Sequence, residues 1–274
     1  MIRDITIGQY YPAKSILHRL DPRVKIMCTL FYLISLFLFK SVLGYALASL
    51  FLIGVIKLSK VPFKFIVKGL KPIILLLMIT VVFNLFLTEG GKVLIHYWVF
   101  KITEEGLRIA VYMAIRLTYL IVGSSLMTLT TTPNALTDGI ESLLYPMNKI
   151  KVPVHEIAMM MSIALRFIPI LLEETDKIMK AQIARGADLE NGNIIQKAKN
   201  MIPILVPLFV SAFRRANDLA MAMESRCYRG GEGRTKMKPL VYKKRDYAAY
   251  AITLIYVVVV FIVGRFVPFQ IWIF

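Results

Sequence analysis

The segment EIAMMMSIALRFIPILLEETDKIMKAQIARG (residues 156–186) predicts one long helix that is apolar in its first half and charged in its second half. Its apolar residues recur at the i, i+3, i+4 spacing of one helix face, as Ile157, Met160 and Met161 illustrate. At about 1.5 Å per residue, a helix from Glu156 to Arg185 spans roughly 45 Å. We therefore expect a helix that begins against lipid or other membrane helices and ends in water.

A second segment, residues 201–227, repeats this plan. It is nearly all apolar from Met201 to Phe213 and carries its charged residues after that point. Each segment finishes on a short motif centred on arginine, which is Ala184-Arg185-Gly186 in the first and Ser225-Arg226-Cys227 in the second. The two ends share few residues when they are aligned, so we interpret them as a parallel design of two helices with positive tips.

The composition indicates an integral membrane protein. Of the 274 residues, 57% are hydrophobic, and the mean hydropathy is +0.65, which is too apolar for an ordinary soluble domain. The formal net charge is +17, but the basic residues cluster beside hydrophobic stretches, where the positive-inside rule predicts them. We therefore expect no nucleic-acid partner. Cys28 and Cys227 are too few for a disulfide framework or a metal cluster.

The hydrophobic stretches predict an all-α membrane protein with about five transmembrane helices. We place these at about residues 24–39, 42–58, 72–87, 106–128 and 247–266. Basic residues before the first stretch and after the second place the N-terminus in the cytoplasm. The expected domains are an N-terminal membrane domain (1–128), a domain with the two long helices and a short amphipathic helix (129–245), and a C-terminal transmembrane helix (246–274).

An alternative topology turns the apolar halves of the two long helices into further spans. These stretches, residues 157–172 and 201–213, have the length of re-entrant, interfacial or buried helices. The alternative also places Lys177 and Lys180 outside, against the charge rule. We expect both helices to stay on the cytoplasmic side, partly embedded.

Two polar residues fall inside predicted spans. Arg116 lies near the centre of the fourth span and Asn84 lies in the third. An intramembrane arginine is a functional candidate, because a charge in the bilayer is costly. The alternative is that Arg116 faces a packed or watery interior and bonds to backbone carbonyls or to Asn84.

No sequence pattern indicates an enzyme. His155-Glu156 begins like a zinc-protease helix motif, but position 159 is Met, so the second ligand is missing. The glycine-rich run at residues 230–233 is not followed by the lysine and hydroxyl residue of a phosphate-binding loop. We expect no catalytic residues, no cofactor and no metal. Energy for any driven transport must then enter from a partner.

The two arginine tips admit two interpretations. An arginine presents a planar, always-charged fork that makes paired bonds to a carboxylate, so a helix that ends on Arg185 or Arg226 suits an acidic groove of another protein. Alternatively, each arginine is a simple helix cap, because cations favour helix C-termini and Gly186 suits the position after the cap. Two such ends on two matched helices favour docking.

Three stretches carry a specific resemblance. They are SxxHRLDPRxK at residues 15–25, LRFIP at 165–169 leading to KAQxARGAD at 180–188, and SRCYRGG at 225–231. The chain resembles the transmembrane T-component of energy-coupling factor transporters over nearly its whole length. One departure is that the second motif reads Ser-Arg-Cys where the family usually resembles Ala-Arg-Gly. A left-handed cap is less favourable at Cys227 than at glycine, which leaves the end of the second helix open.

The resemblance implies a scaffold in a prokaryotic plasma membrane that holds two cytoplasmic ABC-type ATPases, which bind the ATP, and a membrane S-component. The S-component would capture a vitamin or related micronutrient. In that family the two long helices cross and form a coupling domain, here residues 129–245, and the arginine motif at each tip inserts into a groove of one ATPase. The implied ATPase-docking residues are Ala184, Arg185, Gly186, Ser225, Arg226 and Cys227. Four methionines could offer an adaptable surface to the S-component, although they could equally be ordinary core residues: Met159, Met160, Met161 and Met201.

Other functions stay open. A T-subunit dedicated to a transition-metal (cobalt or nickel) or biotin importer is one. Another is a stand-alone secondary transporter or channel, which needs polar groups near the bilayer midplane, where only Asn84 and Arg116 qualify. A membrane enzyme has the least support. The sequence does not name the substrate, because in the leading interpretation another chain binds it.

Overall fold

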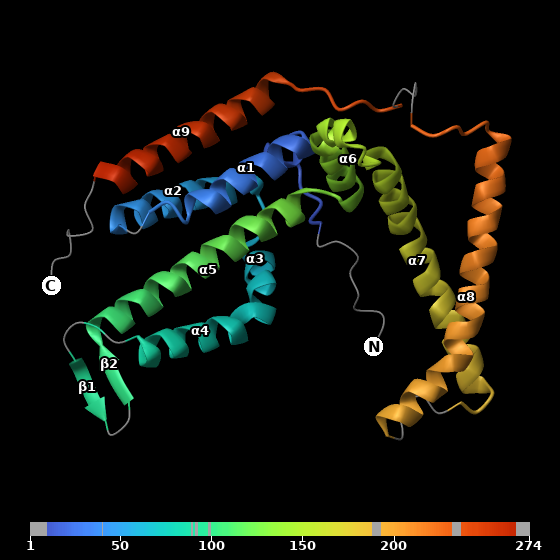
Figure 1. Cartoon of the computed structure of the whole chain (residues 1–274), viewed down its shortest axis with the longest axis horizontal. Coiled ribbons are helices and arrows are strands. Elements are labelled where there is room, and N and C mark those ends of the chain that lie inside the picture. The colour runs from blue at the N-terminus through green and yellow to red at the C-terminus, as the bar shows by residue number, and fades with distance from the viewer. Residues whose placement is uncertain are drawn as a thin grey trace. The chain divides into compact units, whose positions relative to one another are not determined.

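The computed structural model describes residues 10–39, 41–88, 90, 93–97, 100–187, 193–231 and 237–266. The chain divides into two compact units (Figure 1). Of the described residues, the bundle unit comprises 10–139 and 240–266, and the helix-pair unit comprises those between 140 and 239. The domain boundaries expected from the sequence, at 128/129 and 245/246, stay a prediction.

The bundle unit contains most of the apolar helices. Its elements are η2 (Leu17–Arg19), α1 (Pro22–Ser35), α2 (Val42–Ser59), α3 (Phe63–Leu70), η3 (Lys71–Ile73), α4 (Ile74–Leu87), the strands β1 (Val93–Tyr97) and β2 (Phe100–Thr103), α5 (Glu104–Thr130), the first part of α6 (Pro133–Leu144), and α9 (Lys244–Phe266). The helix-pair unit continues α6 and contains η4 (Tyr145–Ile150), α7 (Val154–Ala184) and α8 (Ile194–Ser225). The expected short amphipathic helix is α6.

The all-α fold class is confirmed, with one short exception. The segment between α4 and α5 forms an antiparallel hairpin, in which β1 pairs with β2 and Tyr97 lies opposite Phe100. The lysine-rich segment after α2 also forms a helix, α3, which the hydrophobic stretches did not predict. It bends by 60° into α4, so the two are one broken span or a re-entrant pair.

By length and composition, α2, α5, α7 and α9 are each able to cross a membrane, and α3 with α4 makes a fifth candidate. The expected first span is shorter than the sequence indicated. The helix α1 ends at Ser35 and has 14 residues, which is about 21 Å of helix. Because α7 also meets the length and composition requirements of a span, the alternative topology stays open for it.

Local signals explain where the bundle helices begin. Asp21 caps α1 by accepting a hydrogen bond from the backbone of Arg23, and Pro22 occupies the first helical position, as the sequence predicts. Ser41 caps α2 and Thr103 caps α5 in the same way. The core between the helices is rich in aromatic rings and includes Tyr32, Leu36, Phe39, Tyr45, Leu52, Leu126, Tyr256 and Val260.

Four bundle helices share one end. The helices α1 and α9 begin there, while α2 and α5 end there, and hydrogen bonds described below join the two beginnings to each other and α1 to the end of α5. Lysines and arginines gather in these terminal turns, including Lys25, Lys57, Lys244 and Arg245. We call this the basic end of the bundle unit.

Candidate functional site

The helices α7 and α8 pack against each other in antiparallel directions and cross (Figure 1). Glu174 of α7 accepts hydrogen bonds from the side chains of Ser211 and Arg215 of α8. Two turns farther along α7, Gln182 reaches Pro203. The contact on α8 moves to lower residue numbers as α7 advances, so the C-termini of the two helices lie at opposite ends of the pair.

Near the crossing, a proline in α8 leaves one backbone carbonyl of that helix without its usual hydrogen bond. Pro203 and Pro207 both lie inside α8. Pro207 has no backbone N–H, so it cannot donate the helical hydrogen bond to the carbonyl four residues earlier, which belongs to Pro203. The side-chain amide of Gln182 donates to that carbonyl instead, at 3.2 Å. A gap in the hydrogen bonding of α8 is therefore filled by α7.

The first arginine tip ends α7 in a Schellman motif. The backbone N–H of Gly186 donates to the carbonyl of Ile183, and that of Ala187 donates to the carbonyl of Gln182. Gly186 has a φ of +86°, in the left-handed region that glycine adopts without steric cost. Arg185 is the capping residue itself, and its side chain is exposed.

The second tip has the same geometry despite its different sequence. The N–H of Cys227 donates to the carbonyl of Glu224, and that of Tyr228 donates to the carbonyl of Met223. Cys227 adopts the left-handed conformation, with a φ of +55°. The end of α8 that the sequence left open is therefore at Ser225, with an exposed Arg226 as the cap.

The two tips are matched in geometry and separated in space. Since α7 and α8 are antiparallel, Arg185 and Arg226 lie near opposite ends of the pair. The 31 residues of α7 correspond to about 46 Å at 1.5 Å per residue, and this sets the scale of the separation. Such an arrangement presents two similar, distant, cationic helix ends and suits two separate acidic grooves.

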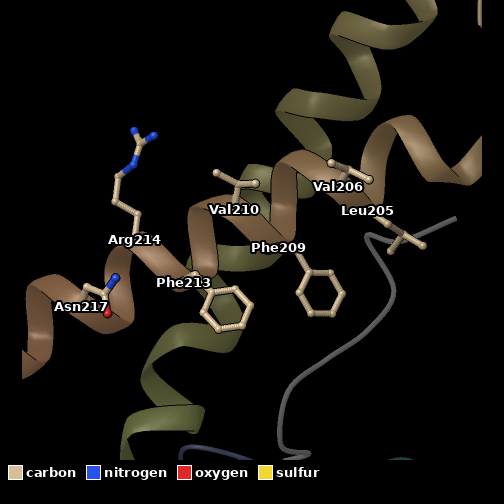
Figure 2. A pocket seen from close by; sticks show the side chains of 7 residues that line it. All are labelled: Leu205, Val206, Phe209, Val210, Phe213, Arg214 and Asn217. Atoms are coloured by element: carbon tan, nitrogen blue, oxygen red, sulfur yellow. The ribbon is translucent and has the colours of Figure 1, made fainter.

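An exposed apolar face of α8 is a feature that the sequence analysis did not single out. It lines a shallow depression of about 620 Å³ and consists of Leu205, Val206, Phe209, Val210 and Phe213, with Arg214 and Asn217 at one side (Figure 2). The side chains of Phe209 and Phe213 are 63% and 67% exposed, and their rings lie 6.4 Å apart. The signal in the sequence was the run from Met201 to Phe213, which is nearly all apolar, so that α7 alone cannot cover every apolar side chain in it.

The four candidate methionines do not form one surface. Met160 and Met161 are exposed near the start of α7, with Met159 half-buried beside them. Met201 is exposed near the start of α8. The starts of two antiparallel helices lie at opposite ends of the pair, so these residues belong to two different places.

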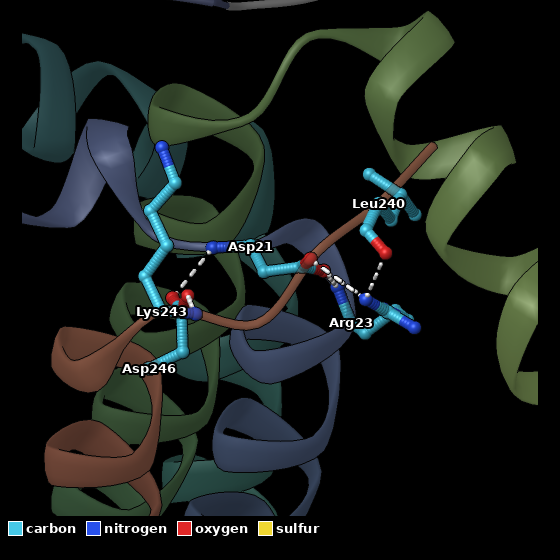
Figure 3. A network of polar contacts seen from close by, with 5 residues as sticks. All are labelled: Asp21, Arg23, Leu240, Lys243 and Asp246. Carbon is cyan, nitrogen blue, oxygen red and sulfur yellow. Dashed lines mark hydrogen bonds and ion pairs between the residues drawn. The ribbon is translucent and has the colours of Figure 1, made fainter. Parts of the chain in front are cut away.

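A polar network at the basic end of the bundle unit connects the starts of α1 and α9 (Figure 3). The carboxylate of Asp246 accepts hydrogen bonds from the backbone N–H of Asp21 at 2.9 Å and of Lys243 at 2.8 Å. The guanidinium of Arg23 binds the Asp21 carboxylate and the carbonyl of Leu240, both at 3.0 Å. We call this network the α1–α9 junction.

The same segment is attached to the end of α5. The ammonium group of Lys25 donates to the carbonyl of Thr130, the last residue of α5, at 2.8 Å. The backbone N–H of Tyr11 donates to the carbonyl of Leu129 at 2.9 Å. The chain leaves the bundle unit after Gly139 and returns at Leu240. The start of α1 is therefore bonded to the returning chain at Leu240 and to the end of α5, which precedes the outgoing connection.

Arg116 and Asn84, the two polar residues of the predicted spans, bond to backbone carbonyls and not to each other. Arg116 donates from Nη2 to the carbonyl of Phe39 at 3.4 Å, and its guanidinium lies 5.5 Å from the centre of the Phe37 ring. Asn84 donates to the carbonyl of Thr80 in its own helix at 2.8 Å. Arg116 therefore makes the contact with a backbone carbonyl that is expected of a packed interior position. The alternative, a hydrogen bond between Arg116 and Asn84, is not observed between these two described residues.

The described residues contain no group of three or more His, Cys, Asp or Glu side chains placed to hold a metal ion. Two of the histidines have structural partners. His155 pairs with Glu141 at 3.0 Å, and His18 contacts Ser15 and the carbonyl of Tyr11. Burial is the main cause that lowers the pKa of His18, and the nearby Lys25 contributes in the same direction.

Comparisons with known proteins agree with this picture. A family model described as CbiQ, cobalt transport protein, matches residues 13–237. The chain is similar to the energy-coupling factor transporter transmembrane protein EcfT of Clostridium kluyveri, with 60% identity over 258 residues that cover 94% of this chain and 96% of the relative. It is also similar to the proteins of the same name from Thermosediminibacter oceani (55% over 252 residues, 92% and 95% covered) and Bacillus subtilis (50% over 246 residues, 90% and 93% covered).

Proposed function

The chain belongs to the EcfT family of energy-coupling factor transporter transmembrane proteins, and from this premise we propose that it couples two cytoplasmic ATPases to a membrane subunit that binds the substrate. The chain itself is then a scaffold of a transport complex and not an enzyme. ATP would be bound and hydrolysed by the partner ATPases. The N-terminus would lie in the cytoplasm of a prokaryotic cell, with the helices in the plasma membrane.

The observation that carries this proposal is the pair of matched arginine tips. Each is exposed, each ends a helix of more than 30 residues in a Schellman motif, and they lie near opposite ends of one antiparallel pair. Two ATPases that sit side by side would offer two grooves a few tens of ångströms apart. One helix pair with a tip at each end can occupy both grooves at once, with Arg185 in one and Arg226 in the other.

The crossing supports the transmission of motion between the tips. Glu174, Ser211 and Arg215 join α7 to α8 near the middle of the pair, and Gln182 bonds to the carbonyl that Pro207 leaves free. When the ATPases bind ATP and close, the two tips would move relative to each other. Joined helices would respond by pivoting about the crossing, and this would move the parts of α7 and α8 that face the membrane.

The α1–α9 junction supports the transfer of that motion into the bundle. Arg23, Asp21 and Asp246 fasten the returning chain to α1, while Lys25 fastens the end of α5 to the same helix. A displacement of the helix-pair unit would therefore pull on α1, α5 and α9 together. A movement of three helices together would allow a scaffold to alter its contact surface with another membrane protein.

The substrate-binding subunit would contact the exposed apolar face of α8. Phe209 and Phe213 are large, exposed and adjacent, which are properties of residues that anchor an interface. Met201, one turn before Leu205, would extend this face, whereas Met159, Met160 and Met161 at the start of α7 would form a separate contact, since Met adapts to varied surfaces. The transported compound would be a vitamin or related micronutrient bound by that subunit.

Cobalt or another transition metal is a second candidate for the cargo. The matching family model carries the description of a cobalt transport protein. The curated relatives that are 50–60% identical carry the broader name of an energy-coupling factor transporter subunit, and this name favours the first candidate. In either case the chain would have the same coupling role, because a different subunit would bind the cargo.

Co-purification from membranes tests the proposal. The wild-type chain should bring down both ATPases and the substrate-binding subunit, and the complex should hydrolyse ATP. The double variant Arg185→Glu, Arg226→Glu should release the ATPases, because each reversed charge is repelled by an acidic groove. A matched control reverses two other exposed cations on the same helices, Lys177 and Arg214, and should leave the ATPases bound.

Two results would contradict the proposal. The first is a wild-type chain that never associates with an ATPase but transports a solute alone under an ion gradient, which would indicate a secondary transporter. The second is a tip variant that retains both association and hydrolysis, which would reduce the arginines to helix caps. Circular dichroism of each variant should confirm that the helical content is unchanged.

A further inference from the structure

A cavity of about 360 Å³ lies inside the bundle unit at its basic end. Its walls are the first turns of α1 and α9, the last turns of α2 and α5, and the segment around η2. Val24, Leu58, Leu126 and Ala249 represent the four helices in the lining. The volume is within the range of roughly 300–1,000 Å³ that small-molecule sites occupy.

The lining is suited to hydrocarbon. Most of the residues around the cavity are aliphatic or aromatic. Two of the polar ones, Thr253 and Cys28, direct their side chains to the backbone carbonyl of Ala249, at 2.9 and 3.9 Å. A lining of this kind offers few hydrogen bonds to a polar solute. It is favourable for an apolar chain, whose surface it removes from water.

Positive charge gathers where the helices that line the cavity begin and end. Lys25 and Arg245 are the charged residues of the lining. The Nε atom of Arg245 is buried and has no hydrogen-bond partner among the residues that the structure describes. The adjacent carboxylate of Asp246 already accepts two backbone N–H groups, from Asp21 and Lys243. One donor of the Arg245 guanidinium is therefore left without a partner among the described residues, on a side chain that lines the cavity.

The cavity also opens to the surface of the bundle. Ile16, Leu58 and Ile252 line it and are 59%, 49% and 60% exposed. Arg245 and Ile252 are two turns apart on one face of α9, which is about 10 Å, and Ala248 and Ala249 lie between them. A molecule with an anionic head and an apolar tail would place its head at Arg245 and its tail along this face.

We propose that this cavity binds one phospholipid with an anionic headgroup. The head would bind at Arg245, and one acyl chain would fill the space between α1, α2, α5 and α9. The basic residues of this end favour the cytoplasmic leaflet, where anionic lipids are enriched and basic pockets between helices bind their headgroups. The proposal is independent of ATPase docking, because it uses neither arginine tip.

Lipid retention by the full-length chain tests the site. The chain, purified in a neutral detergent, is titrated with dioleoyl phosphatidylglycerol or dioleoyl phosphatidylcholine, and bound lipid is counted by native mass spectrometry. The wild type should retain one phosphatidylglycerol in preference to phosphatidylcholine. Arg245→Gln should weaken phosphatidylglycerol binding roughly fivefold, which is the effect of about one cation near an anionic headgroup. Lys244→Gln is the matched control, because the exposed Lys244 does not line the cavity, and it should bind as the wild type does.

A second variant tests the tail. Ala248 is exposed and lines the cavity, so Ala248→Phe should fold normally while it blocks the space for the chain. It should lower the binding of both lipids. Glycerol 3-phosphate should not compete with phosphatidylglycerol, because it has a head without a tail.

Four outcomes would overturn the proposal. Equal binding of the two lipids by the wild type would remove the headgroup specificity. Equal losses of phosphatidylglycerol binding in Arg245→Gln and Lys244→Gln would indicate that the lipid is attracted by the overall positive charge of the surface and not by a site at Arg245. Competition by glycerol 3-phosphate would indicate a site for free phosphate. Normal lipid retention by Ala248→Phe, together with loss of a co-purifying membrane subunit, would indicate that a protein helix occupies the cavity.

Discussion

Gln182 of α7 donates a side-chain hydrogen bond to the backbone carbonyl of Pro203 in α8, at 3.2 Å. The acceptor is available because the residue four positions later is Pro207, which has no N–H to offer. A missing backbone donor in α8 thus creates a specific contact with α7. The hydrogen bond joins α7 to α8 at the place where the backbone of α8 lacks a donor.

This relationship predicts that the effects of two substitutions depend on each other. Gln182→Leu should leave the Pro203 carbonyl without its donor and loosen the crossing by about 0.5–1.5 kcal/mol, the net value of an ordinary hydrogen bond. In a Pro207→Ala background the alanine N–H can satisfy the same carbonyl, so Gln182→Leu should then have a smaller effect. Hydrogen–deuterium exchange of α8 peptides in all four combinations measures the coupling, and strictly additive effects would contradict it.

The two helix ends predict opposite effects of substitutions at equivalent positions. Cys227 occupies the left-handed region with a side chain that glycine lacks, so Cys227→Gly should stabilise the end of α8 by about 1 kcal/mol. Gly186→Ala should destabilise the end of α7, because its φ is +86°. The cost should be of similar size and come from the backbone conformation alone, because no atoms crowd the added methyl group. Thermal unfolding in detergent measures both. Cys227→Ala is the control and should be nearly neutral, because alanine has the same backbone preference as cysteine.

The α1–α9 junction predicts a large effect of a single carboxylate. Asp246 is 1% exposed and satisfies two backbone N–H groups, so Asp246→Ala leaves two donors unpaired in a buried place. The expected cost is about 2 kcal/mol or more. Asp246→Asn keeps one acceptor oxygen and should cost less. The melting temperature of the purified chain measures both, and the exposed Asp218→Asn should not change it.

His18 predicts a dependence of stability on pH. Its pKa is lowered in the folded chain, chiefly by burial, whereas the unfolded chain keeps a value of about 6.5. Below that pH the unfolded state binds a proton that the folded state resists, so stability falls as the pH drops through this window. Melting temperatures between pH 7.5 and pH 5 measure the effect. His18→Gln should show a weaker dependence, since it removes this group and leaves the other titrating groups in place.

The sequence predicts features of this fold that depend on neighbouring residues. The long amphipathic patterns predict α7 and α8, Asp21-Pro22 predicts the start of α1, and Gly186 predicts the end of α7, because each signal acts within a few residues. Apolar length alone was less reliable. It placed the end of the first span at residue 39, whereas α1 ends at Ser35, and it gave no sign of α3.

Contacts between distant residues could not be predicted. Asp246 and Asp21 are 225 positions apart, and nothing near either residue indicates that one carboxylate serves two helix starts. The antiparallel direction of α7 and α8 is another such case, since the sequence shows two matched helices but not their relative direction. The left-handed conformation of Cys227 also differs from the preference of its residue type, and the Schellman hydrogen bonds offset that cost.

The separation of the arginine tips gives the sharpest prediction of the coupling proposal. If each tip occupies its own groove, Arg185→Glu alone should release one ATPase and Arg226→Glu alone should release the other, while each variant retains one bound ATPase. The stoichiometry of the purified complex, measured by native mass spectrometry with the two ATPases distinguished by mass tags, decides the matter. ATP hydrolysis that needs two closed ATPases should be lost in both single variants. If either single variant released both ATPases, the tips would act as one site, and the antiparallel arrangement of α7 and α8 would have no role in holding two separate partners.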